Sequence, residues 1–144
     1  MSAAASGFEK ARAAATPGAA ADGIEDARLR MKALRCVVRN FKNAMGFQGR
    51  LDVALSGGAK RTSDLMELTG FMRDEIENAQ ELAGLLRESK RPIFQCSPTR
   101  AGEDVFVLGP DLAEQLDKKA AIMLGHFCDP QRLLVWTGWR PPSD

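Results

Sequence analysis

TSDLMELTGFMRDEIENAQELAGLL, residues 62–86, can be interpreted in two ways, and the choice between them sets the architecture of the chain. Apolar residues recur in it every three or four positions, which is the spacing of one face of an α-helix. The stretch therefore predicts one long amphipathic helix, or two helices that are broken at Thr69-Gly70. The apolar positions are Leu65, Leu68, Met72, Ile76, Ala79, Ala83 and Leu86, widened by Phe71, Leu82 and Leu85.

A second amphipathic helix is predicted upstream, over residues 24–45. Its apolar positions are separated by three and four residues in turn, which is a period of 3.5 sustained over three heptads. Asp22 is a candidate N-cap, and Gly46 is the expected end of the helix. The apolar positions are Ile24, Ala27, Met31, Leu34, Val38, Phe41 and Met45.

The two predicted helices carry opposite charge. Residues 24–45 have a net charge of +4, and residues 63–86 have a net charge of −5. We expect the helices to pack antiparallel through their apolar rows, with the charged flanks side by side. We expect the basic flank to pair with the acidic helix or to be solvated. Binding of nucleic acid, of an acidic partner or of an anionic membrane surface is less favoured. The basic flank comprises Arg28, Lys32, Arg35, Arg39 and Lys42.

The remaining segments predict shorter elements. Glycines mark residues 46–61 as a connection, in which residues 51–55 are a candidate short strand. The segments IFQC (93–96) and VFVL (105–108) predict the two strands of a β-hairpin, because β-branched and aromatic residues flank a turn rich in Pro, Gly and Asp. RLLVWTGW (132–139) predicts a last strand.

A third helix is expected after Gly109-Pro110-Asp111 and before Asp129-Pro130. The expected fold class is therefore α+β: mostly helical, with two long amphipathic helices, a β-hairpin, a third helix and a short C-terminal strand. Residues 1–22 are expected to be a disordered Ala-rich tail, residues 23–139 a single domain and residues 140–144 an extended tail. The apolar face of the third helix comprises Leu112, Leu116, Ala120, Met123 and Phe127.

Residues 63–127 resemble winged helix-turn-helix regulators. Leu65, Gly70, Phe71, Ile76 and Ala79 stand at the apolar and turn positions of that motif, and the segment LAGLLRESKRPIFQCSPTRAGEDVFVLG is similar to the end of a recognition helix followed by a two-stranded wing. The resemblance implies a DNA-binding regulator that dimerises through its third helix. The nucleic-acid contacts would then come from Lys60, Arg61, Arg73, Asn78, Arg87, Lys90, Arg91 and Arg100.

Motifs that carry catalytic or metal chemistry are weak. The loop LSGGAKRTSD (55–64) is similar to phosphate-binding loops, but Lys60 and Arg61 stand where such a loop needs Asp and Ser. His126 is the only histidine, and no C-x-x-C or H-x-x-x-H pair accompanies it. We therefore predict no catalytic residue, no metal ligand, no cofactor and no enzymatic activity.

The preferred function is a non-enzymatic regulatory or protein–protein interaction module that binds through amphipathic helices, either to another protein or as a homodimer. DNA is the less favoured alternative, because the groove-facing positions would bring carboxylates to a polyanion. The three widely spaced cysteines and the lack of an apolar run of 18 residues predict a cytoplasmic protein without a membrane span. The predicted interaction residues are Met31, Leu34, Val38, Phe41, Met45, Trp136 and Trp139.

Overall fold

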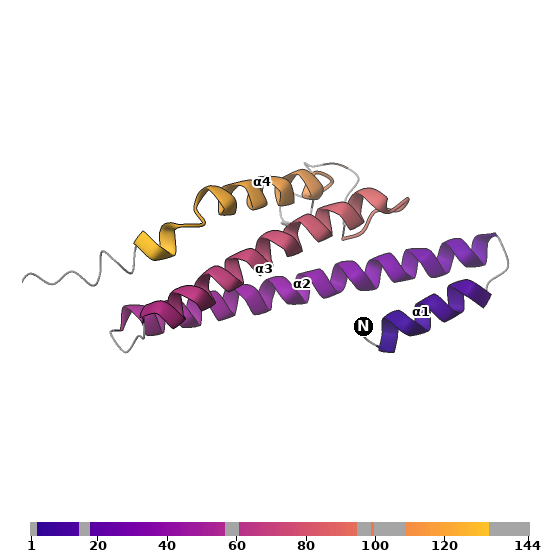
Figure 1. Ribbon diagram of the computed structural model, residues 1–144. Helices are drawn as coiled ribbons and strands as arrows, with labels where there is room; N and C mark the ends of the chain where they lie inside the picture. The colour runs from indigo at the N-terminus through magenta and orange to yellow at the C-terminus, as the bar shows by residue number, and fades with distance from the viewer. Residues whose placement is uncertain (1–2, 15–17, 57–60, 95–98, 100–108, 133–144) are drawn as a thin grey trace, which may run out of the picture.

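The computed structural model of the chain describes residues 3–14, 18–56, 61–94, 99 and 109–132. These ranges hold the helices α1 (Ala3–Ala14), α2 (Ala19–Leu55), α3 (Arg61–Glu88) and α4 (Leu112–Gly125). Figure 1 shows α3 between α2 and α4, while α1 lies beside the N-terminal part of α2. The core therefore consists of two helix–helix interfaces that share α3 (Figure 1).

The stretch 62–86 lies within a single helix. α3 runs through Thr69 and Gly70 without a break, and the Thr69 hydroxyl donates a hydrogen bond of 2.9 Å to the carbonyl oxygen of Leu65 within the same helix. A glycine inside a helix costs about 1 kcal/mol relative to alanine. Burial of the neighbouring Leu68 and Met72 offsets that cost, so packing rather than local propensity keeps α3 continuous.

The apolar row predicted on α3 is confirmed. It divides between two interfaces: Leu82 and Leu85 pack towards α2, whereas Ile76 and Ala79 pack against Ala120 of α4. An apolar stripe that is wide enough for two neighbours explains why α3 is the central helix. The buried members of the row are Leu68, Met72, Ile76, Ala79, Leu82, Ala83 and Leu85.

α2 is longer than predicted, because Gly46 does not end it. The helix continues to Leu55, so the candidate strand over residues 51–55 is wrong and these residues are helical. Burial explains the extension, since Ala54 and Leu68 form a small cluster to which the C-terminal part of α2 contributes. Gly46 lies against the ring of Phe71 in α3, which leaves no room for a side chain there.

The predicted α+β fold class is wrong, because no strand occurs among the described residues and the fold is mostly α. Ile93 and Phe94, which were expected to start the hairpin, form a bend in which Ile93 is buried in the core and Phe94 has a φ of 60°. Burial of Ile93 beneath the end of α3 explains its apolar character without a sheet. The rest of the expected hairpin (95–98 and 100–108) and residues 133–139 of the expected last strand lie outside the described residues.

The Ala-rich N-terminal segment also differs from expectation. Residues 3–14 form α1 and α2 begins at Ala19, where a disordered tail was expected. Alanine has the highest helix propensity of all residues, which favours helix in such a segment. Gly18, between the two helices, has a φ of 138°, a conformation that a side chain would strain.

The third helix is confirmed as α4. Ala120 is buried, and Leu116, Met123 and Phe127 pack against the core formed with α3. Two ion pairs connect α4 to α3, from Arg87 to Asp117 and from Lys119 to Glu75. The first pair is exposed, whereas the second has a buried carboxylate and is part of the cluster described below.

Candidate functional site: the two faces of α2

α2 buries the face opposite to the apolar row that the sequence predicted as its core face. We call its buried side the inner face. Its buried members are Leu29, Ala33, Cys36, Asn43 and Ala54, and Asn40, Phe47 and Arg50 are half-buried among them. We call the row Met31, Leu34, Val38, Phe41 and Met45 the outer face. Each of the inner-face residues 33, 36, 40, 43 and 47 follows an outer-face residue by two positions, which is about 200° around the helix axis.

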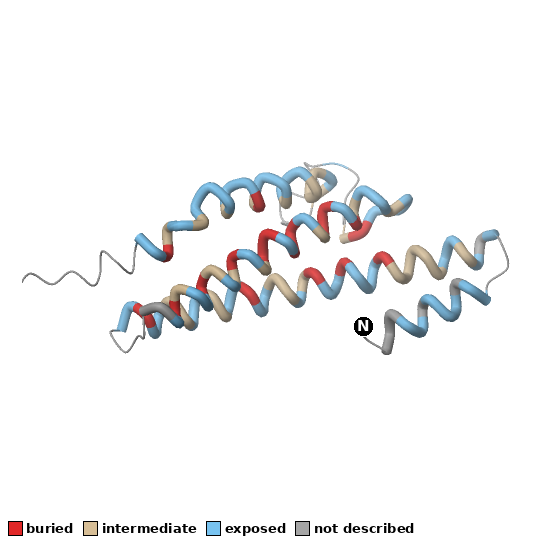
Figure 2. Tube along the Cα trace, in the orientation of Figure 1, coloured by how far each residue is buried: buried red, intermediate tan, exposed pale blue. Residues whose placement is uncertain are grey.

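The outer face exposes large apolar side chains. The exposed fractions are 47% for Met31 and Leu34, 61% for Val38, 63% for Phe41 and 75% for Met45. In Figure 2 the buried stretches of α2 alternate with exposed ones, whereas those of α3 follow each other closely. Single exposed apolar residues are common, but a continuous row of them marks an interaction surface. The expected packing of two apolar rows against each other is therefore wrong for α2.

The inner face meets α3 through a buried carboxylate. Glu75 is 6% exposed and accepts hydrogen bonds from Asn40 Nδ2 at 2.5 Å and Asn43 Nδ2 at 2.9 Å. Asn78 Nδ2 lies at 3.4 Å from Glu75 Oε2, and the Lys119 ammonium of α4 completes the set. A buried carboxylate is stable when donors fill its lone pairs, so this cluster joins three helices in one register.

Two pKa values reflect this environment. Burial raises the pKa of the Glu75 carboxyl, but the hydrogen bonds from Lys119, Asn40 and Asn43 and the charge of Lys119 outweigh burial and hold the pKa below its ordinary value of 4.5. Burial raises the pKa of the Cys36 thiol to about 11, with a further contribution from the charge of Glu81. Glu75 is therefore ionised and Cys36 is a neutral, unreactive thiol near neutral pH.

The predicted pairing of basic and acidic flanks is confirmed for Arg28, Arg35 and Arg39. Arg39 of α2 lies 3.4 Å from Asp74 and 3.6 Å from Glu77 of α3, measured between nitrogen and oxygen atoms. Three further arginines of α2 pair with α3 at 3.1–3.5 Å. Each exposed pair contributes little, about 0 to 1 kcal/mol, but together they hold opposite charges of the two helices side by side. These pairs are Arg28–Glu88, Arg35–Glu81 and Arg50–Asp64.

A groove of about 260 Å³ lies beside the Glu75 cluster, between α2, α3 and α4. Its lining combines Glu75, Lys119 and two amides with apolar side chains, and Oδ1 of Asn43 is buried without a hydrogen-bond partner in the described part of the chain. The Glu75 carboxylate already accepts four hydrogen bonds from the protein. We therefore interpret the groove as the solvent-facing edge of a cluster that stabilises the fold. Its apolar lining comprises Ala44, Phe47, Phe71, Met72 and Met123.

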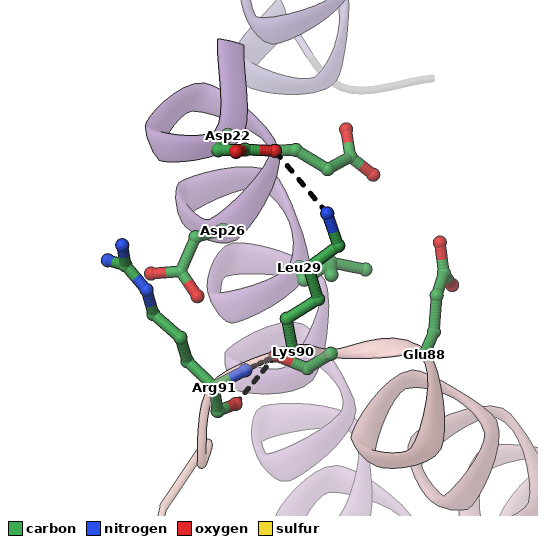
Figure 3. A pocket seen from close by; sticks show the side chains of 8 residues that line it. Asp22, Asp26, Leu29, Glu88, Lys90 and Arg91 are labelled. Atoms are coloured by element: carbon green, nitrogen blue, oxygen red, sulfur yellow. Dashed lines mark hydrogen bonds and ion pairs between the residues drawn. The ribbon is translucent and has the colours of Figure 1, made fainter. Parts of the chain in front are cut away.

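A second groove, of about 290 Å³, lies where the N-terminal part of α2 passes the end of α3 (Figure 3). Lys90 reaches across it to Asp22 at 3.5 Å, and Asp26 and Arg91 line the same opening. The Ser89 hydroxyl donates a hydrogen bond of 2.7 Å to the Arg91 carbonyl oxygen and so shapes the turn. The groove has acidic and basic groups on its walls, and among the described residues no group of His, Cys, Asp and Glu is arranged to hold a metal ion.

Of the described residues that were predicted for nucleic-acid contact, one is buried and two form ion pairs within the chain. Asn78 is 1% exposed and donates to the carbonyl oxygen of Cys36 at 2.9 Å, so it is not available to read a base. Arg73 and Arg91 are exposed, Arg87 pairs with Asp117, and Lys90 pairs with Asp22. Lys60, Arg100 and the side chain of Arg61 lie outside the described residues, as do Trp136 and Trp139.

The sequence interpretation missed the Glu75 cluster. A signal was present, because small and polar residues recur along the inner face with the same 3.5-residue period as the apolar row. Glu75 also stands next to Ile76 inside the apolar row of α3, where a carboxylate requires buried partners. The apolar row has the stronger periodic signal, but it lies on the face that the fold leaves open.

Comparison with protein-family models, with curated proteins and with solved structures finds no match to this chain. Among the described residues, no helix combines the length and the apolar character that crossing a membrane requires.

Proposed function

We propose that the chain is a protein–protein interaction module that docks a helical partner on the outer face of α2. The observation that carries this proposal is the exposed row from Met31 to Met45, in which each large apolar side chain is at least 47% exposed. Complete burial of such a side chain contributes about 1.5–3 kcal/mol, so a partner that covers the row gains a fraction of this at each position. A straight helix with its own apolar stripe matches the shape of the row.

The folded unit offers this face without having to unfold. The inner face is already occupied by α3, and the ion pairs of Arg39 with Asp74 and Glu77 hold α2 against that helix. Docking on the outer face breaks none of these contacts, because the two faces lie on opposite sides of the helix. The partner therefore meets a preformed surface, which limits the ordering cost of binding.

Protein is a better partner for this unit than DNA. A helix-turn-helix needs a break between its two helices, and α3 is continuous through Gly70. The acidic residues Asp74 and Glu77 lie on the exposed side of α3 beside Arg39, where they would repel a phosphate backbone. Burial of Asn78 removes one of the side chains expected to contact nucleic acid. The cytoplasm is the proposed compartment, in keeping with the free thiols of Cys36 and Cys128.

A photo-reactive group on the outer face tests the proposal for any protein partner. We expect Phe41→p-benzoylphenylalanine, introduced in the cell that makes the protein, to give a discrete protein adduct on irradiation, because its side chain would be covered by the partner. Mass spectrometry identifies the chain in the adduct. The matched control is the same group at Ile122, which is 63% exposed on α4.

The adduct from position 41 should disappear when Leu34→Glu is added, because a charge in the row would have to be buried on docking. Equal, diffuse labelling from positions 41 and 122 would contradict the proposal, since the outer face would then be no more contacted than the outside of α4.

A further inference from the structure

We propose that the partner on the outer face is a second copy of this chain, with the two α2 helices parallel and in register around Val38. This inference rests on the proposed function and names the occupant of the same surface. In a symmetric pair the same patch serves both copies, so each outer-face residue must be compatible with itself across the axis. An apolar row without a charged member from Met31 to Met45 satisfies that condition.

The side-chain types in the row favour a two-stranded pair. Its period of 3.5 residues divides it into two alternating sets, Met31, Val38 and Met45 in one and Leu34 and Phe41 in the other. Val38 in the first set and Leu34 in the second are the β-branched residue and the leucine that parallel two-stranded coiled coils prefer at these positions, and methionine and phenylalanine fill the others. Gln48 and Asp52 continue the two sets as polar residues and bond to each other at 2.7 Å, which ends the apolar row towards the C-terminal part of α2.

Two copies do not repel each other strongly. Residues 24–45 have a net charge of +4 and residues 63–86 a net charge of −5, so the α2–α3 unit is close to neutral. The arginines beside the outer face are paired inside their own copy, Arg39 with Asp74 and Glu77 and Arg35 with Glu81. In each copy, α3 therefore supplies the carboxylates that pair with these arginines.

The charged flanks distinguish the two orientations. Arg28, Arg35 and Lys42 flank the row on one side, and Arg30, Val37 and Ala44 flank it on the other. An antiparallel pair that covers the whole row is centred near Val38 and would place the basic flank against itself, with Arg35 beside the partner's Lys42. A parallel pair places Lys42 beside the partner's Val37, whose surface its aliphatic stem can cover. It also places Arg35 beside the partner's Arg30, but each of these arginines already pairs with a carboxylate of its own copy, Arg30 with Asp26 at 2.9 Å and Arg35 with Glu81 at 3.5 Å. Like charges that face each other are destabilising, and for Lys42 no ion pair is found among the described residues, so its approach to Arg35 in the antiparallel pair is the less favourable contact and the parallel pair is favoured.

The proposed contact between the two copies lies on the part of α2 that α1 does not cover. α1 lies beside the N-terminal part of α2, where Ile24 and Ala27 are only half-exposed, and the bare part of the row begins at Met31 (Figure 1). From residue 31 to residue 45 the row extends over two heptads, about 21 Å at 1.5 Å per residue. Two copies would meet along this length, with α1 of each copy at the same end of the pair.

Cysteine cross-linking in the purified full-length chain tests both the occupant and the orientation. In a Cys96→Ser, Cys128→Ser background, which keeps the buried Cys36, we would introduce Met31→Cys and Met45→Cys separately. In a parallel pair each position lies opposite itself, so each variant alone should form a disulfide-linked dimer under mild oxidation. In an antiparallel pair residue 31 lies opposite residue 45, so only a mixture of the two variants should cross-link. Ile122→Cys, on the outside of α4, is the matched control.

Sedimentation of the chain without introduced cysteines should show a monomer–dimer equilibrium, and Val38→Glu should raise its dissociation constant by about 30-fold or more. Cross-linking only in the mixture would overturn the parallel orientation. A chain that stays monomeric at all concentrations and gives no more cross-linking than Ile122→Cys would overturn the second copy as the occupant. The same would follow if the monomer instead sedimented with anionic phospholipid vesicles. The adduct from Phe41→p-benzoylphenylalanine separates these failures, because a different protein in that adduct would leave the proposed interaction function intact.

Discussion

The inner and outer faces of α2 have the same period but opposite chemistry. The inner face buries alanine, cysteine and asparagine against α3, whereas the outer face exposes methionine, leucine, valine and phenylalanine. Small residues let two helices approach closely, and the amides of Asn40 and Asn43 reach Glu75 across the short gap. Within one chain, the face with more apolar surface is therefore not necessarily the one that the fold buries.

The two faces also divide two tasks. The Glu75 cluster fixes the register of α2 against α3, because a shift of one helix along the other would separate Asn40 and Asn43 from the carboxylate. The outer face has no such directional contact and gains free energy from any surface that removes it from water. On this interpretation the inner face fixes the monomer and the outer face supports association.

Removing the carboxylate should give the largest change in folding stability. Glu75→Ala leaves the amides of Asn40 and Asn43 and the Lys119 ammonium without their shared acceptor, so we expect the free energy of unfolding to fall by about 3 kcal/mol. Urea denaturation followed by circular dichroism measures this. Glu77→Ala, which removes a carboxylate that is 60% exposed, should change stability by less than about 0.5 kcal/mol. If both variants lose the same amount, the buried cluster has no special role.

The outer face should show the reverse pattern. We expect Phe41→Ala to leave the unfolding free energy of the diluted monomer within about 0.5 kcal/mol, because Phe41 is 63% exposed, and to weaken association by about 2 kcal/mol. Denaturation at low concentration and sedimentation across concentrations measure the two effects separately. A large loss of monomer stability would mean that the outer face packs within its own copy, and the contrast between the faces would fail.

Acid should weaken the inner face and not the outer one. The pKa of Glu75 in the folded chain lies below its ordinary value, so the folded state binds this proton less readily than the unfolded state does. The stabilisation is therefore complete above about pH 4.5 and is lost as the pH falls through the lowered pKa. Glu75→Gln should remove this part of the acid sensitivity. Unfolding free energies of both proteins at neutral pH and near pH 3 measure the difference, and equal pH dependence would contradict the depressed pKa.

The sequence predicted the helices better than their partners. The rows of α3 and α4 were correct because both helices bury their most apolar side, as Ile76 and Ala120 do. The row of α2 was recognised but assigned to the wrong neighbour, since periodicity identifies a face and not what covers it. The predicted strand at Ile93 failed because a short apolar run has no period of its own, and tertiary packing under α3 explains it equally well.

The sequence pattern indicated the polar inner face of α2 but not the complete Glu75 cluster. Lys119 comes from α4, which is far from α2 along the chain, and its approach to Glu75 depends on how α3 is shared between the two interfaces. Pairing of the charged flanks was predictable, because it follows from the opposite net charges of two adjacent helices. Directional contacts among three helices can be predicted only when the positions of the helices are known, whereas charge pairing can be predicted from the net charges alone.

Two glycines of α2 allow the smallest but most closely matched test. Gly49 is exposed, and a Cβ atom there meets nothing within 4 Å, so Gly49→Ala should stabilise the helix by about 0.5–1 kcal/mol. Gly46 has the same helical conformation but lies against the Phe71 ring, so Gly46→Ala must displace that ring and should destabilise the chain by about 1 kcal/mol. Thermal denaturation of the two variants measures opposite shifts in melting temperature. If both variants were stabilised equally, α3 would not hold Phe71 against α2, and the inner face would end before Gly46.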